Sequence, residues 1–183
     1  VVLLCGGTPA GQGGAADLSD VKQAALQIGK HMNRSRFTVV AVKSTVPAGT
    51  AAALSAAIGR ASGLEAGRSF EVVSNPEFLR EGSALEDVFR PDRIVVGARG
   101  ARARAVMRKL YRMLRTADTR YFETDTTTAE LIKYASNAFL AVKISYANEM
   151  ARLCDALGAD VAGLLAGVGM DSRIGGKFLE VSS

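Results

Sequence analysis

The chain has 183 residues, of which 48% are hydrophobic and 22% are charged, a balance that excludes a disordered or collagen-like chain. The formal net charge of +5 favours anionic ligands in general without selecting one. We see no signal peptide and no apolar run long enough to span a bilayer, so we expect a cytoplasmic protein without a membrane partner.

The N-terminal segment is typical of a buried parallel strand that runs into a glycine-rich loop. The chain starts without Met on the apolar run 1–5, and Gly6, Gly7, Thr8 and Pro9 follow directly. Because a sheet does not ordinarily open on an interior strand, we expect the chain to be an internal fragment of a longer protein.

Strand and helix patterns alternate along the rest of the first two thirds of the chain. Further strands are expected at 37–42, 70–73, 94–96 and 120–122. Helices are expected at 17–31, 50–61 and 99–114. This alternation predicts an α/β fold, a partial doubly wound, Rossmann-like parallel sheet within residues 1–124, followed by a helical domain within 125–183.

The predicted helix 99–114 carries a basic tract, with Val106, Leu110 and Leu114 on its predicted inner side. The basic residues are Arg99, Arg102, Arg104, Arg108, Lys109, Arg112 and Arg115. Such a tract is compatible with nucleic-acid binding, but Tyr111 is the only aromatic residue within it. A solvated outer face is the better interpretation, and we expect no nucleic-acid partner.

Three loops follow the predicted ends of strands, at 6–9, 44–49 and 75–82. Ligands bind at the carboxyl ends of the strands in open parallel sheets, so these loops are expected to line one crevice. The first can bring bare backbone close to a ligand, and the second offers hydroxyl groups. The third carries Glu77 and Glu81 with Arg80 between them.

Residues 126–157 form the longest uninterrupted pattern of the chain. No Gly or Pro occurs there, and Asp125 with the three Thr that follow it can cap a helix. Apolar residues cover two sides of this predicted helix, which is typical of a helix wedged between layers or subunits. Lys133 and Asn137 stand four residues apart and therefore share one face.

Four long motifs resemble the UDP-glucose/GDP-mannose dehydrogenase family. They are KSTVPAGT (43–50), VVSNPEFLREGSALEDVFRPDRIVVG (72–97), ELIKYASNAFLAVKISYANEMARLCDALGAD (130–160) and GMDSRIGGKFL (169–179). The resemblance extends over nearly the whole chain. Lys43 in the first motif and the PDRIVVG segment are more similar to the UDP-glucose 6-dehydrogenase branch.

The resemblance implies an NAD-dependent oxidoreductase. Residues 1–124 would be the C-terminal part of the NAD-binding domain, and 125–183 a truncated central dimerisation domain. Members of the family oxidise the C6 alcohol of a nucleotide sugar to a carboxylate with two NAD, through a thiohemiacetal and a thioester on a catalytic Cys. We therefore expect NAD as cofactor, UDP-glucose as substrate, UDP-glucuronate as product, a homodimer through the long helix, and no metal.

The resemblance also implies roles for individual residues. Contacts to NAD are implied for Gly7, Thr8, Pro9, Ser44, Thr45, Val46 and Glu81. Contacts to the nucleotide sugar are implied for Glu77, Phe78, Leu79, Arg80, Glu81, Lys133, Asn137 and Arg173. Lys133 and Asn137 would stabilise an oxyanion at C6, and Thr45 and Glu81 would position or activate water.

Two features of the family are missing from these 183 residues: the Gly-x-Gly-x-x-Gly fingerprint and the Gly-Gly-Ser-Cys-Phe segment that carries the nucleophile. Cys5 and Cys154 cannot replace that nucleophile, because both lie in apolar surroundings and are expected to be buried, reduced thiols. The isolated chain is therefore expected to be inactive.

Other functions remain open at this point. A GDP-mannose or UDP-N-acetylmannosamine dehydrogenase is the nearest alternative. A dimerisation or binding module without catalysis is an alternative from another class, although the presence of Thr45, Glu81, Lys133 and Asn137 argues against it. If the parent reading frame contains the two missing segments, the protein is an enzyme; if it lacks them, the binding module is favoured.

Overall fold

The computed structural model describes residues 1–116 and 119–179. The chain divides into two compact units, Val1–Tyr134 and Ala135–Ser183, and the boundary falls inside the long helix α5 (Thr126–Leu157).

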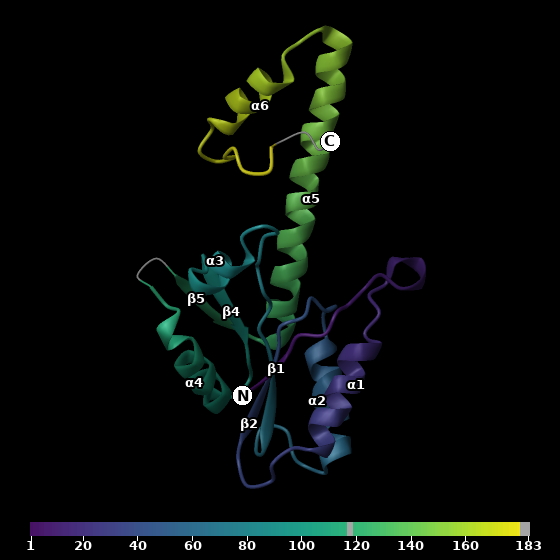
Figure 1. Ribbon diagram of the computed structural model, residues 1–183, viewed down its shortest axis with the longest axis vertical. Coiled ribbons are helices and arrows are strands. Elements are labelled where there is room, and N and C mark those ends of the chain that lie inside the picture. The colour runs from purple at the N-terminus through teal and green to yellow at the C-terminus, as the bar shows by residue number, and fades with distance from the viewer. Residues whose placement is uncertain (117–118, 180–183) are drawn as a thin grey trace. The chain divides into compact units, whose positions relative to one another are not determined.

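The first unit contains a five-stranded sheet in the order β1-β2-β3-β4-β5 (Figure 1). The strands are β1 (Val2–Leu4), β2 (Thr38–Val42), β3 (Phe70–Ser74), β4 (Arg93–Gly97) and β5 (Arg120–Thr124). Neighbouring strands are parallel except β3 and β4, which meet in an antiparallel pair at Ser74 and Gly97. The predicted α/β, Rossmann-like class is confirmed, and the sheet is mixed because this one pair is antiparallel.

The reversal follows from the connection between β3 and β4. Residues 75–92 hold only the short helix α3 (Ala84–Phe89), so no helix carries the chain back to the start of the sheet. A parallel pair requires such a crossover. The chain therefore re-enters from the edge where β3 ends, and the Asn75 side chain donates to the carbonyl oxygen of Val95 at 2.8 Å across the junction.

Helices cover both faces of the sheet, as a doubly wound fold requires. Helices α1 (Ser19–Lys30) and α2 (Thr50–Ser62) lie side by side on one face, and α4 (Ala101–Leu110) lies on the other (Figure 1). Alternation along β2 separates the two cores, because Val40 and Val42 pack with α1 and α2, whereas Val39 and Ala41 pack with α4.

Strand β1 pairs with β2 in parallel. Val2 and Leu3 are exposed, and Leu4 is the buried residue of the strand. Cys5 follows the strand and is also exposed, which corrects the expectation of two buried thiols. Cys154 is buried as expected, and both cysteines are free.

Helix α4 ends earlier than the sequence pattern predicts. It stops at Leu110 and continues as a 3-10 turn, Tyr111–Met113, so its buried residues are Ala103 and Met107, while Leu110 is exposed. Several basic residues of the tract bind within the chain. Arg102 stacks on Phe37, Arg115 stacks on Tyr121, Arg104 donates to the carbonyl oxygen of Ala98, and Arg108 pairs with Glu123.

Helix α5 spans the residues predicted from the sequence. The Asp125 carboxylate accepts hydrogen bonds from the backbone N–H and the hydroxyl of Thr128, at 2.9 and 2.6 Å, which is the expected N-terminal cap. In the first unit, the buried residues of α5 are Thr126, Ala129, Glu130 and Lys133.

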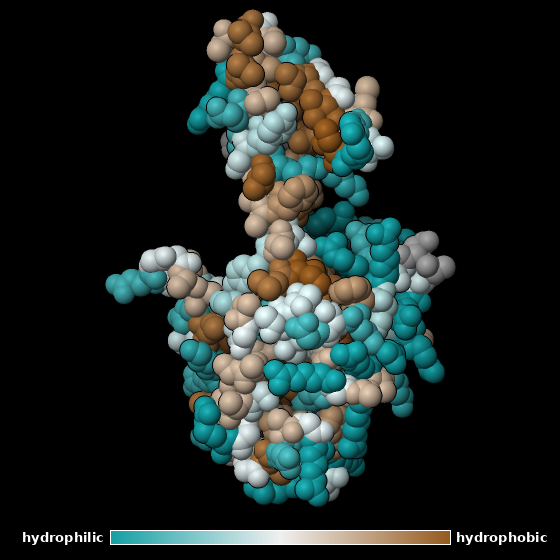
Figure 2. Space-filling view, turned by 180° about the vertical axis from the view of Figure 1, so that it is seen from behind, coloured by the Kyte–Doolittle hydropathy of each residue, from teal (hydrophilic) through white to brown (hydrophobic). Residues whose placement is uncertain are grey.

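The second unit contains the rest of α5, helix α6 (Val161–Gly169) and the turns that follow it. Asp160 caps α6 by accepting a hydrogen bond from the N–H of Ala162. Ala147, Cys154 and Leu165 are buried. Hydrophobic side chains gather on the surface of this unit, in the upper part of Figure 2. Within residues 1–116 and 119–179, no helix is long and apolar enough to cross a membrane.

Gly97 allows β4 to pass directly over the start of α5. A Cβ atom at this position would lie 2.6 Å from both the Ala129 Cβ and the Asp125 carbonyl oxygen. We expect Gly97→Ala to lower the free energy of unfolding by about 1–3 kcal/mol in urea titrations, because two backbone segments would have to separate. Gly7→Ala is the control, since no atom lies within 4 Å of a Cβ there. Equal losses in the two variants would contradict this role of Gly97.

Candidate active site

The first two strand-end loops are joined by side-chain hydrogen bonds. The Thr8 hydroxyl donates to the carbonyl oxygen of Thr45 at 2.9 Å, and the Ser44 hydroxyl donates to that of Gly6 at 2.6 Å. Both loops follow parallel strands that end at the same edge of the sheet. The prediction that these two loops adjoin is confirmed.

An ion pair joins the third loop to α5. The Lys133 Nζ lies 3.0 Å from the Glu77 Oε1, and the Lys133 side chain is 7% exposed. Burial alone would raise the pKa of Glu77, but the N–H of Leu79 and the Lys133 ammonium outweigh burial, so this pKa is lowered. The carboxylate is therefore ionised at neutral pH and holds a buried cation at the strand ends.

Phe78 lies between two cations. The Arg93 guanidinium stands over its ring at 4.0 Å from the centroid, and the Lys133 Nζ is 5.4 Å away. Arg93 is the first residue of β4, so the reversal of that strand brings it to the edge where β3 ends. The third loop is thus held from the sheet and from α5.

Lys43 adds a second ammonium group to this region. Burial lowers its pKa because water no longer stabilises the charged form, and Glu77 offsets part of that effect. Lys133 also acts on Lys43, in the unfavourable direction. The Glu77 carboxylate therefore interacts with two ammonium groups, Lys43 after β2 and Lys133 on α5.

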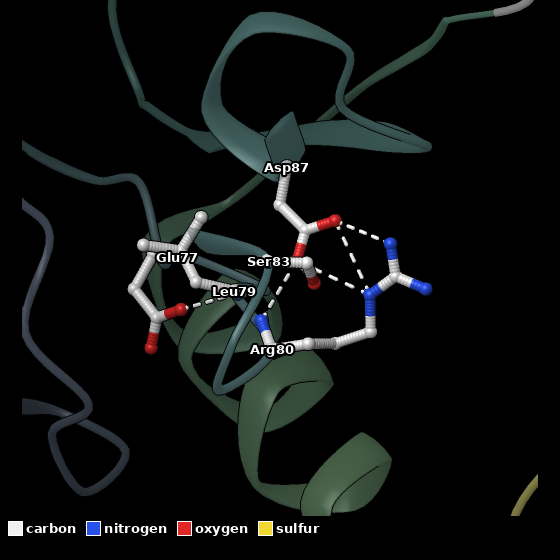
Figure 3. Close-up of polar contacts among 5 residues, drawn as sticks. All are labelled: Glu77, Leu79, Arg80, Ser83 and Asp87. Atoms are coloured by element: carbon white, nitrogen blue, oxygen red, sulfur yellow. Dashed lines mark hydrogen bonds and ion pairs between the residues drawn. The ribbon is translucent and has the colours of Figure 1, made fainter. Parts of the chain in front are cut away.

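Arg80 pairs with neither Glu77 nor Glu81. Its side chain and its backbone N–H both donate to Asp87 of α3, with distances of 2.5 Å from Nη2 and 2.8 Å from the backbone nitrogen. The guanidinium lowers the pKa of Asp87 to about 2. Figure 3 shows the Glu77 and Arg80 side chains on opposite sides of the loop. This pair gives the loop a fixed shape and turns Arg80 away from Lys133.

The remaining predicted site residues are not all gathered at this cluster. Gly7 and Pro9 are exposed in the first loop, Val46 is buried in the second, and Leu79 and Glu81 are exposed in the third. Glu81 forms no hydrogen bond or ion pair with another residue in 1–116 or 119–179. Asn137 and Arg173 belong to the second unit, where Arg173 pairs with Asp171.

Glu130 was missed by sequence reasoning. It is 2% exposed, and its two carboxylate oxygens accept hydrogen bonds from the N–H groups of Gly49 and Ala51, each at 2.7 Å. Burial raises its pKa, against the effect of these two donors. The spacing of Glu130 and Lys133 on one side of the predicted helix could have indicated a polar, buried face.

Asn75 anchors the start of the third loop, a role that the sequence alone does not indicate. It is 1% exposed, its side-chain amide donates to Val95, and its oxygen accepts a hydrogen bond from the Tyr111 hydroxyl at 2.5 Å. Burial raises the pKa of Tyr111, which keeps the phenol protonated as a donor. Asn75 thus fixes where the third loop begins.

This arrangement can stabilise negative charge on an oxygen atom. A buried ammonium fixed by an ion pair suits an alkoxide or an oxyanion. The glycine backbone of the first loop is open, and no atom would meet a Cβ on Gly7 within 4 Å. Such a loop at strand ends fits a dinucleotide. Residues 1–116 and 119–179 contain no cluster of His, Cys, Asp and Glu that could hold a metal ion.

Two domain models match the chain. Residues 1–115 match the NAD binding domain of the UDP-glucose/GDP-mannose dehydrogenase family, and residues 127–183 match the central domain of that family.

Curated relatives are similar over almost the whole chain. UDP-glucose 6-dehydrogenase TuaD of Bacillus subtilis is 45% identical over 181 residues, which is 98% of this chain and 38% of TuaD. UDP-glucose 6-dehydrogenase of Rhizobium meliloti is 50% identical over 182 residues, 98% of this chain and 40% of that protein. The chain thus spans about two fifths of the length of these relatives.

Solved structures share the fold. A UDP-glucose dehydrogenase from Pyrobaculum islandicum has a TM-score of 0.90 and 44% identity, over 98% of this chain and 40% of that one. A GDP-mannose dehydrogenase from Pseudomonas aeruginosa, solved as a ternary complex, has a TM-score of 0.88 and 32% identity, over 93% and 39%.

The Glu77–Lys133 pair generates a prediction about pH. The folded pKa of Glu77 is below its ordinary value of 4.5, so its contribution to stability is present above that pH and is lost as the pH falls through the folded pKa. Lys133→Met should lower the free energy of unfolding by about 1–3 kcal/mol at pH 7 in urea titrations. The difference from the unsubstituted chain should shrink below pH 4.5.

The control for this experiment is Arg68→Met, which removes the exposed Glu65–Arg68 pair. It should change the free energy of unfolding by less than about 0.5 kcal/mol at either pH. A Lys133→Met effect that stays constant from pH 7 to below pH 4.5 would show that Glu77 is not the partner that matters.

Proposed function

The chain belongs to the UDP-glucose/GDP-mannose dehydrogenase family, and we propose that it supplies the cofactor-side and central parts of an NAD-dependent UDP-glucose 6-dehydrogenase. The reaction would convert the C6 alcohol of UDP-glucose to the carboxylate of UDP-glucuronate. One water is consumed, two hydrides pass to two NAD, and three protons are released.

The buried Lys133 ammonium is the observation that carries this proposal. Each oxidation, and the hydrolysis of an acyl intermediate, places negative charge on the C6 oxygen. An ammonium fixed before the reaction stabilises that charge without having to reorganise. Glu77 holds Lys133 at 3.0 Å, which keeps the cation directed to the strand ends where the sugar would lie.

The first and second loops would hold NAD, which supplies a hydride acceptor when bound. Gly7, Thr8 and Pro9 would contact it from the first loop, and Ser44, Thr45 and Val46 from the second. The hydrogen bond between Thr8 and Thr45 supports this assignment, because it gives the two loops one fixed surface before any ligand binds.

The remaining residues would act on the sugar and on water. Glu77 to Glu81 would wrap the substrate, and Asn137 would add an amide donor to the oxyanion that Lys133 stabilises. Thr45 and Glu81 would position water, for which the exposed, unpaired carboxylate of Glu81 is suited. Arg173 would bind the nucleotide sugar.

Relatives favour UDP-glucose over GDP-mannose as the substrate. The chain is 45% and 50% identical to two UDP-glucose 6-dehydrogenases and 32% identical to a GDP-mannose dehydrogenase. With NAD and a nucleotide sugar as ligands, we place the protein in the cytoplasm.

We also propose a homodimer through α5. Large apolar side chains repeat along one side of this helix within the second unit and are exposed. They are Phe139, Val142, Tyr146, Leu153 and Leu157. A continuous apolar stripe of this kind is stable in water when a second helix covers it, and a second copy of the chain presents the same stripe.

Activity can be tested in a chimera in which these residues replace the matching segment of the Bacillus subtilis relative. We expect the chimera to form NADH from UDP-glucose, and Lys133→Ala to lower its kcat by about 10²–10³-fold because an oxyanion donor is lost. Lys109→Ala, on the exposed side of α4, is the control and should keep full activity. An inactive but folded chimera, or equal activity in both variants, would refute the proposal.

The dimer is tested by sedimentation equilibrium of the 183-residue chain. We expect Phe139→Glu to produce monomers at concentrations where the unsubstituted chain is dimeric, because a charge would have to be buried in the stripe. Ala141→Glu is the matched control, since this exposed residue lies on the opposite side of the same helix. The proposal fails if both variants sediment like the unsubstituted chain, or if that chain is itself monomeric.

A further inference from the structure

The carboxylate of Glu130 is buried without a cation. Among residues 1–116 and 119–179 it forms no ion pair, and its two oxygens instead accept hydrogen bonds from Gly49 and Ala51, each at 2.7 Å. These N–H groups belong to the first turn of α2 and the residue before it. The positive end of that helix therefore balances the buried charge.

Helix α2 has no cap of its own. Its N-cap residue is Gly49, which has a positive φ of 91° and provides no side-chain hydrogen bond. The unsatisfied N–H groups at a helix start require acceptors. Here the acceptor comes from α5, about eighty residues further along the chain.

The bond to Gly49 fixes the second strand-end loop at its far end. The near end is already held by the hydrogen bonds of Ser44 and Thr45 to the first loop. The loop that carries Thr45 is therefore attached to the first loop at one end and to α5 at the other.

Glu130 and Lys133 lie on the same buried side of α5 but reach different loops. Lys133 stands about 4.5 Å further along the helix axis and pairs with Glu77 of the third loop. Two bonds from Glu130 to N–H groups two residues apart attach the start of α5 to the start of α2 at two points.

We propose that Glu130 is a positioning residue that fixes α5 against the second loop and thereby keeps the Lys133 ammonium beside Glu77. The consequence for catalysis rests on the function proposed above, whereas the positioning itself does not. Glu130→Gln is the most conservative test, because it keeps the size of the side chain but sets an amide NH₂ against one of the two donors.

Glu71 provides a matched control. It is also buried, and its carboxylate accepts hydrogen bonds from Arg99 and Gly100 at 2.8 Å each, at the start of α4. Neither of these bonds reaches the strand-end loops or α5. Glu71→Ala leaves both donors without an acceptor, so it should destabilise the chain at least as much as Glu130→Gln.

The readout in the 183-residue chain is the rate at which an acylating reagent modifies Lys133, followed by mass spectrometry well below the Tm of each variant. Lys133 is buried, so its modification requires local opening. We expect Glu130→Gln to raise the rate about tenfold, because the local opening that exposes Lys133 then breaks one buried hydrogen bond fewer. We expect Glu71→Ala to leave the rate unchanged. An unchanged rate in Glu130→Gln, or an equal rise in both variants, would overturn the proposal.

The chimera provides the catalytic readout. Glu130→Gln should lower kcat at least about tenfold, because a misplaced ammonium stabilises the oxyanion poorly. If Glu130 acts through Lys133, the same substitution in the Lys133→Ala background should lower kcat less than about twofold further. If Glu130→Gln lowers kcat by the same factor with and without Lys133→Ala, Glu130 does not act through Lys133. An inactive unsubstituted chimera would refute the proposed function only, since the acylation result stands apart from it.

Discussion

A buried ammonium group needs a negative charge within reach, and in this protein Lys133 finds it in Glu77. The pair ties the third loop to α5. Phe78 of that loop also contacts both Lys133 and Arg93, the first residue of β4. In the function proposed above, a cation held in this way would act on a ligand at the strand ends.

Two buried glutamates perform the same physical task at different helices. Glu130 caps α2, and Glu71 caps α4. Neither helix has a Ser, Thr, Asp or Asn as its N-cap residue, and Gly49 and Gly100 occupy those positions. At Gly100 the absence of a Cβ leaves room for the carboxylate, since a Cβ would lie 2.4 Å from Glu71 Oε2, whereas Gly49 accommodates a positive φ of 91°. In both cases the helix start becomes a tertiary contact.

Local patterns predicted the elements well where the determinants are local. The bounds of α5 follow from the cap at Asp125 and from a run without Gly or Pro, and both were visible in the sequence. Three features were not predictable in this way. The direction of β4, the pairing of Arg80 with Asp87 and the capping by Glu130 each depend on residues that meet only after the chain has folded.

The antiparallel junction between β3 and β4 also bears on how the chain folds. One backbone pair and the Asn75 side chain join the two parts of the sheet across it. On one side, β1, β2, β3 and the two helices that cover them come from a single continuous stretch, and on the other side β4, α4 and β5 come from another. One core lies wholly within the first stretch, whereas Val39, Ala41 and Val73 of that stretch complete the other core against β4 and α4. The first can therefore collapse on the ribosome before the second has been synthesised, and the junction is where the two folding steps are joined.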